Sequence, residues 1–306
     1  MTQINTRAHH TAAVQRMTDL SARVDTLQAQ ITTTKRVNTP ADDPVAFTRA
    51  AVLRRADIAG AAMTRGIDAA TRRLSATDVA LESITGLVQR AKELALIGSN
   101  GTLAPADRAT IATEVAELAK QFAGLADSRG SDGERLFGGA AAAVPAYVLD
   151  AAGVMVWAGA GMAPSLDIGG ARLATGIEGP EAFGRNDATS GAQDLFATFA
   201  SLAAALTEPD AALREPALAA TLGQIDGHVD RLADTRASAG ARLARLDAET
   251  ERLARTSLAT KADLSKLEDL DMGEAISRMQ RLITVLQATQ GAFVKTSNLS
   301  LWDLLR

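Results

Sequence analysis

A series of apolar residues spaced alternately three and four positions apart constrains this chain more than any other feature. The first such series lies near the amino end and consists of Met17, Leu20, Val24, Leu27 and Ile31. These spacings place an apolar stripe along one side of a helix, which is typical of helices that pack side by side in coiled coils and bundles. The series therefore predicts packed helices near the start of the chain.

The same spacing continues through a much longer stretch. Asn38-Thr39-Pro40 breaks the first helix, and Asp43 followed by Pro44 predicts an N-cap and the first residue of the next helix. Apolar heptad positions then run from Ile67 to Ala95. A continuous helix over 44–97 would extend about 80 Å, whereas helices in globular proteins average about 11–12 residues. Such a length indicates a bundle or a coiled coil.

The middle of the chain has a different pattern. Glycines between 129 and 139 end the helical spacing, and between 140 and 185 the apolar periodicity falls to two. Short apolar runs on both sides of Gly153 and of Gly169-Gly170 predict two β-hairpins. We therefore expect a small β-rich insert.

Helical spacing resumes after the insert. Pro209 and Pro216 are expected to interrupt it, and a long helix is predicted beyond them. The acidic run from Glu268 to Asp271 is expected to serve the start of a last helix, with Asp271 and Glu274 as a pair that resembles a capping box. The apolar positions of this last stretch are Ile276, Met279, Ile283, Leu286, Phe293, Leu301, Leu304 and Leu305.

These patterns predict a mainly α-helical fold. We expect a long antiparallel helical bundle or coiled coil built from the amino- and carboxyl-terminal segments, with a small β-rich domain inserted in the middle. Three regions are predicted: a terminal helical polymerisation region of 1–40 with 272–306, a helical bundle of 41–136 with 190–271, and an outer β-rich domain of 137–189.

Residues that carry chemistry are scarce. The chain has no cysteine, and its net charge of −4 comes without a dense Lys/Arg stripe, so neither thiol chemistry nor nucleic-acid binding is expected. His9, His10 and His228 lack the spacing of metal ligands and are expected to be solvated surface residues. We expect no cofactor, no metal and no membrane span, and the sequence does not indicate an enzyme.

The terminal apolar stripes require partners. Burying the five side chains of the first series would contribute about 8–15 kcal/mol in total, which is lost if they face water. Pairing the two ends of one chain covers one stripe on each, but other apolar residues lie off these stripes: Val14, Val285, Val294 and Trp302. We therefore expect further helices from identical or related subunits. The alternative is that both ends pack onto the bundle of the same molecule.

Several segments resemble the flagellin superfamily, in the same order and at similar spacing. Residues 35–46 (KRVNTPADDPVA) resemble its R-I-x-x-P-x-D-D-P-x-A segment. Further matches lie at 74–81 (LSATDVAL), 89–96 (QRAKELAL), 99–108 (SNGTLAPADR), 267–275 (LEDLDMGEA) and 300–305 (SLWDLL). The resemblance covers about 1–139 and 190–306. The prolines of PADDP, the Leu136–Gly139 ending and the short insert look more like the hook-associated members of the superfamily than its filament-forming members.

The resemblance implies a structural subunit at the junction between hook and filament of a bacterial flagellum. It implies an extracellular location, reached by flagellar type III export without a cleaved signal peptide. The implied partners are further copies of the chain in a ring or filament, another hook-associated protein on the hook side, flagellin on the filament side, and an export chaperone at the C-terminal helix. By the family pattern, the two chain ends form the inner tube, the helices around 44–130 and 190–270 form the next shell, and the insert faces outward. The apolar series of the two ends are the expected subunit-packing residues.

Two other functions remain open at this point. A short flagellin that forms the filament itself would have the same terminal helices. A soluble helical binding protein with a ligand site in the β insert would belong to a different class of function.

Overall fold

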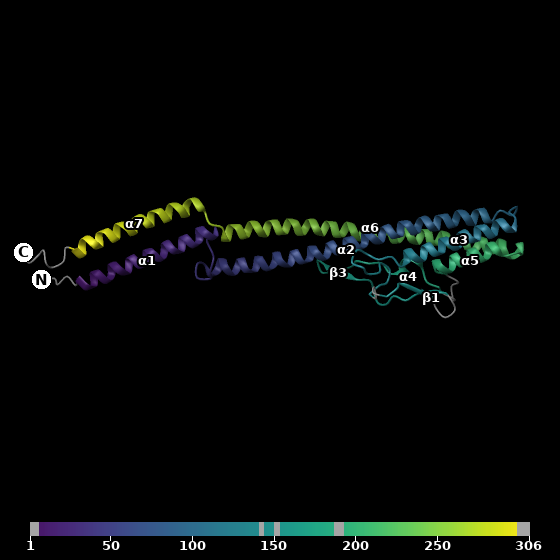
Figure 1. The fold of residues 1–306 in the computed structure, drawn as a ribbon, viewed down its shortest axis with the longest axis horizontal. Coiled ribbons are helices and arrows are strands. Elements are labelled where there is room, and N and C mark those ends of the chain that lie inside the picture. The colour runs from purple at the N-terminus through teal and green to yellow at the C-terminus, as the bar shows by residue number, and fades with distance from the viewer. Residues whose placement is uncertain (1–5, 141–143, 150–153, 187–192, 299–306) are drawn as a thin grey trace, which may run out of the picture. The chain divides into compact units, whose positions relative to one another are not determined.

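The computed structural model describes residues 6–140, 144–149, 154–186 and 193–298, which contain seven helices and four short strands (Figure 1). The chain divides into two compact units. The terminal unit consists of residues 1–61 and 254–306, and the central unit consists of residues 62–253. The prediction of a mainly α-helical fold with a small β-rich insert is confirmed.

Four long helices account for most of the chain. They are α1 (Thr6–Thr33), α2 (Pro44–Gly98), α6 (Ala211–Glu268) and α7 (Met272–Asn298). The helix predicted over 44–97 is confirmed by α2, which begins at the predicted Pro44. Within the terminal unit, α2 and α6 are joined by a hydrogen bond of 2.8 Å from Ser257 Oγ to Asp57 Oδ1.

The central unit adds three shorter helices and two hairpins. The helices are α3 (Pro105–Ala126), α4 (Gly179–Phe183) and α5 (Leu195–Thr207). Strand β1 (Tyr147–Leu149) pairs antiparallel with β2 (Met155–Trp157), and β3 (Ser165–Ile168) pairs antiparallel with β4 (Ala171–Ala174). Both predicted hairpins are therefore present. Gly169 and Gly170 have φ of +59° and +82°, the left-handed values that a two-residue hairpin turn requires.

Pro216 does not interrupt the helix, contrary to the expectation from sequence. It lies inside α6, which begins one turn earlier at Ala211. The side chain of Asp210 accepts a hydrogen bond of 2.9 Å from the backbone N–H of Ala212 and so satisfies the first turn. Beyond the proline, burial of Leu218 and Ile225 in the core stabilises the helix. Pro209, in contrast, does lie between α5 and α6.

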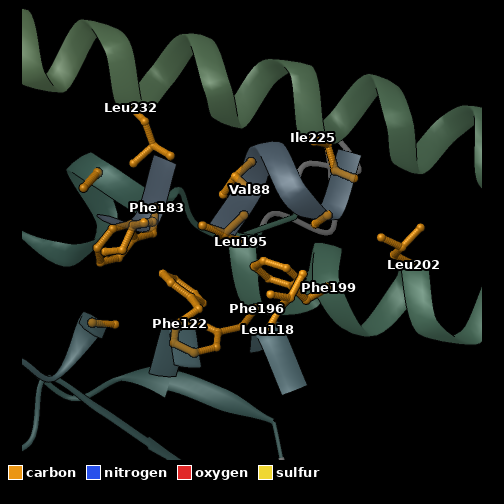
Figure 2. Packing of buried hydrophobic residues seen from close by; sticks show 14 of the residues in the cluster. Val88, Leu118, Phe122, Phe183, Leu195, Phe196, Phe199, Leu202, Ile225 and Leu232 are labelled. Carbon is orange, nitrogen blue, oxygen red and sulfur yellow. The ribbon is translucent and has the colours of Figure 1, made fainter. Parts of the chain in front are cut away.

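Aromatic residues are few but concentrated in one core. Five of the seven phenylalanines gather between α3, α4 and α5 in the central unit: Phe122, Phe137, Phe183, Phe196 and Phe199. Phe122 meets Phe183 edge to face with ring centroids 5.1 Å apart, and Phe196 with centroids 4.3 Å apart. Figure 2 shows Leu232 and Ile225 pointing from α6 toward this cluster. The core therefore joins segments on both sides of the insert.

The hairpin β3–β4 packs against a second, smaller apolar cluster. Ile168 and Leu173 from the hairpin are buried together with Ile67, Leu74 and Leu246 from α2 and α6. The insert is thus anchored to the helices of the central unit by its own apolar side chains.

His228 is buried, which corrects the expectation that it is a solvated surface residue. Only 5% of its surface is exposed, because it lies on the face of α6 that packs against α5. Its Nε2 lies 3.0 Å from Thr198 Oγ1. Burial, with a smaller contribution from the charge of Arg231, lowers the pKa of His228 to about 4. The imidazole is therefore neutral at pH 7.

Candidate assembly site at the terminal helices

The two terminal helices pair with each other. Helices α1 and α7 lie side by side in the terminal unit (Figure 1). The rings of His10 and Phe293 lie 4.7 Å apart, whereas Leu27 and Ala275 line one groove near the other end of the pair. The two helices are therefore antiparallel.

This pair covers the predicted apolar seam only in part. Leu27 is buried, with 8% of its surface exposed, whereas Ile276 is 40% exposed. The remaining described seam residues are half-buried: Met17, Leu20, Val24, Ile31, Met279, Ile283, Leu286 and Phe293. Leu301, Leu304 and Leu305 lie outside the described residues. One copy of the chain therefore leaves much of its seam in contact with water.

Apolar residues outside the seam are more exposed still. Val14 on α1 is 42% exposed, and Val285 and Val294 on α7 are 49% and 55% exposed. Single exposed valines are ordinary on a protein surface. Together with the half-covered seam, however, these valines leave apolar surface on the paired helices that contact between α1 and α7 does not remove from water.

Aspartates cap the first turns of α2 and α7, the two helices of the terminal unit that follow non-helical segments. The side chain of Asp43 accepts a hydrogen bond of 2.9 Å from the backbone N–H of Ala46, and Pro44 is the first residue of α2. Asp271 accepts a hydrogen bond of 3.0 Å from the backbone N–H of Glu274 in the first turn of α7. The hydrogen bond from Ala46 holds the pKa of Asp43 below its usual value, with a further contribution from Arg36.

Glu268 has a role that the sequence did not indicate. It was expected to contribute to the start of the last helix, but it is the last residue of α6 and its side chain is buried. A carboxylate is disfavoured at a helix C-terminus by the helix dipole. Here it is offset by two cations, since Lys35 Nζ lies 2.9 Å and Arg54 Nη2 lies 2.6 Å from its two oxygens.

Backbone hydrogen bonds complete this clamp between the segment after α1 and the end of α6. The N–H of Arg36 donates to the carbonyl of Glu268 at 2.6 Å, and the N–H of Leu270 donates to the carbonyl of Thr34 at 3.1 Å. Burial alone would raise the pKa of Glu268, but Lys35 and Arg54 outweigh it and the pKa lies below its usual value. The side chain is therefore charged at neutral pH.

Sequence reasoning could not find this clamp, because Lys35 and Glu268 are separated by 233 positions. Within the described ranges, no three His, Asp or Glu side chains are grouped as a metal site would require. No described helix is long and apolar enough to cross a membrane.

Both end regions of the chain match protein-family models of helical segments. Residues 4–142 match the family model of the bacterial flagellin N-terminal helical region, and residues 222–305 match that of the C-terminal helical region. The chain belongs to the flagellin family. The two matched regions contain α1 and α7, the helices that pair in the terminal unit.

Several of the similar proteins are named as hook-associated or junction proteins. The chain is 28% identical over 288 residues to flagellar hook-associated protein 3 of Escherichia coli K12, covering 90% of each chain. It matches the structure of a putative flagellar hook-associated protein from Vibrio parahaemolyticus with a TM-score of 0.67 at 20% identity, over 74% of this chain and 100% of the other. It also matches the flagellar junction protein FlgL from Legionella pneumophila with a TM-score of 0.55 at 16% identity, over 64% and 98%. The two structural matches support the fold.

Proposed function

We propose that this chain is a structural subunit of the bacterial flagellum, located at the junction between hook and filament. The observation that carries the proposal is the 90% mutual coverage with hook-associated protein 3 of Escherichia coli, together with flagellin-type helices at both ends. The subunit acts by packing and not by catalysis.

Assembly through the terminal helices is the proposed mechanism. The seam between α1 and α7 is half-buried in one copy; Ile276 of the seam is exposed, and so are Val285 and Val294 outside it. Covering this surface with helices of adjacent copies removes apolar area from water, which favours association. In this mechanism the described seam residues and Leu301, Leu304 and Leu305 are the subunit-packing residues.

The proposed partners follow from the position at the junction. They are further copies of the chain, another hook-associated protein on the hook side and flagellin on the filament side. Export through the flagellar type III apparatus, with a chaperone bound at the C-terminal helix, belongs to the same proposal. The subunit is then extracellular.

Immunogold labelling of isolated flagella tests the location. A hook–filament junction subunit gives label only where the filament meets the hook, at low copy number. Label along the whole filament would instead identify a short flagellin, and absence of label from flagella would contradict both. A matched control is labelling of a strain that lacks the chain.

A further inference from the structure

Two exposed apolar surfaces, one in each unit, carry opposite charges. The terminal unit contains 15 Lys and Arg against 11 Asp and Glu, whereas the central unit contains 17 against 25. The mild net charge of −4 thus conceals a positive terminal unit and a strongly negative central unit. Unlike charge on two units of one chain favours contacts between the unlike units of different copies.

The positive surface lies on the first part of α2, and we call it the cationic strip. Val45 and Val52 are 73% and 58% exposed, and their spacing of seven places them on one face of the helix. Arg49 lies between them and Arg55 follows one turn later, both exposed. Within the described part of the chain neither arginine has an ion pair. The strip is therefore apolar and cationic, with its charges uncompensated.

The second surface lies around the turn between α2 and α3 in the negative central unit and includes the exposed Glu215, and we call it the acidic end. Leu96 and Ile97 at the end of α2 are 54% and 49% exposed, and Leu213 in the first turn of α6 is 61% exposed. A groove of about 280 Å³ opens beside them, lined by the turn 98–101 and by residues of α6 that include Glu215, Leu218 and Leu222.

The charge of the acidic end is not neutralised by its own arginine. Arg214 is buried, and its guanidinium donates to the backbone carbonyls of Glu208 and Pro209 at 3.2 and 3.4 Å. Glu215 remains exposed on the rim of the groove, without an ion pair in the part of the chain that the structure describes. The acidic end therefore combines a groove, exposed leucines and unpaired negative charge.

We propose that the cationic strip of one copy packs on the acidic end of the next copy in the assembly. Both surfaces expose apolar side chains, and the charges of Arg49 and Arg55 on one are opposite to the charge of Glu215 on the other. A contact between two unlike surfaces repeats from copy to copy and builds a ring or filament, whereas a contact between two like surfaces stops at a dimer. This inference rests on the proposed function, because it names the partner surfaces of the assembling subunit.

Cysteine cross-linking in assembled flagella tests the contact directly, since the chain has no native cysteine. Val52→Cys and Leu213→Cys are produced as single variants, singly and together in one cell, in a strain lacking the native chain. A double variant that carries both cysteines in one chain is also produced. After mild oxidation of isolated flagella, the single variants alone should give no covalent dimers, their mixture should give dimers, and the double variant should give a ladder of larger products. Val79→Cys is the matched control, because Val79 is 62% exposed on α2 but outside both surfaces.

Charge exchange provides an independent measurement. Arg55→Glu is expected to lower the amount of the chain retained in flagella at least about tenfold, because an attraction becomes a repulsion. Glu215→Arg is expected to do the same, and the two together to restore retention. Restoration by the pair is not expected from a folding defect, which two separate substitutions would only worsen.

The outcomes distinguish this inference from the proposed function. Dimers from Val52→Cys alone, equal cross-linking of Val79→Cys with either surface, or no rescue by the paired charges would overturn the contact. Immunogold label at the hook–filament junction would then still support the proposed function. Failure of the label itself would contradict the function, whatever the cross-links.

Discussion

His228 and Glu268 are both buried titratable side chains, but only for Glu268 do neighbouring charges stabilise the charged form. Lys35 and Arg54 compensate the carboxylate of Glu268, so its ionised form is retained. The imidazole of His228 is buried beside Thr198. Burial and the charge of Arg231 outweigh its hydrogen bond with the backbone of Gln193, so its neutral form is retained. Of these two described side chains, His228 is therefore the one that makes the folded state sensitive to pH near neutrality.

Acidification is expected to destabilise the central unit through His228. The pKa is about 4 when folded and near 6.5 when unfolded, so between these values the unfolded chain binds more protons. The free energy of unfolding therefore falls as pH falls, by about 2 kcal/mol from pH 7.5 to 5. Hydrogen exchange of α5 peptides at the two pH values measures it.

His228→Gln removes this titration and should remove most of the pH dependence. Burial raises the pKa of Asp194, which acts in the opposite direction at lower pH, so the window is kept above pH 5. His10→Gln, on the exposed surface of α1, is the control and should leave the slope unchanged. An equal slope in His228→Gln would assign the effect to another group.

Individual residues were predictable where the cause is local. Asp43 before Pro44 and Asp271 before Glu274 could be assigned from sequence because a cap and its helix are neighbours in the chain. The burial of His228 and the cations around Glu268 could not, since they depend on α5, α2 and the segment after α1. Such contacts leave no spacing pattern in a single sequence.

The helix α7 depends on its first turn, because its seam is only half-covered in one copy. Asp271→Ala removes the side chain that accepts from the N–H of Glu274, and we expect a loss of about 1 kcal/mol. Faster hydrogen exchange in the first turn of α7 and in the α1 residues packed against it would measure this loss. Asp271→Ser keeps an acceptor and should lose much less, so equal losses would assign the effect to charge rather than to capping.

Whole elements were predicted well where the pattern is long or the turn is specific. The spacing along α2 and the Gly169-Gly170 turn are of this kind. The five-residue helix α4 is too short to establish a period, and its stability comes from burial of Phe183 in the aromatic core. For Pro216, the decisive signal was Asp210, whose cap allows α6 to begin before the proline.

At the scale of the whole molecule, removal of Asn298 to Arg306 is expected to prevent assembly. The deletion removes Leu301, Leu304 and Leu305 of the predicted packing seam, while the central unit keeps its own core. Analytical ultracentrifugation and circular dichroism should find a helical monomer, and cells carrying it should lose motility. Normal motility would contradict assembly through the chain ends. Met162→Ala, at a position that is 76% exposed and outside the packing seam, is the control and should retain motility.

The architecture as a whole followed from periodicity, because an apolar stripe at each end and a break in the middle allow few arrangements. Which surfaces of a subunit remain exposed did not follow, since exposure depends on how helices distant in sequence pair. The cationic strip and the acidic end are visible only once the faces of α2 and α6 are known.

The clamp at Glu268 and the pairing of α1 with α7 also fix when folding can be completed. Lys35 and its partner Glu268 are 233 positions apart. Helix α1 therefore cannot pair with α7 until almost the entire chain is available. Contacts of such long range form slowly, and they cannot form while the two extremities are held apart. Under the proposed export, a polypeptide threaded lengthwise through a narrow conduit keeps this unit open until both of its ends have emerged, so the clamp closes only after transport is complete.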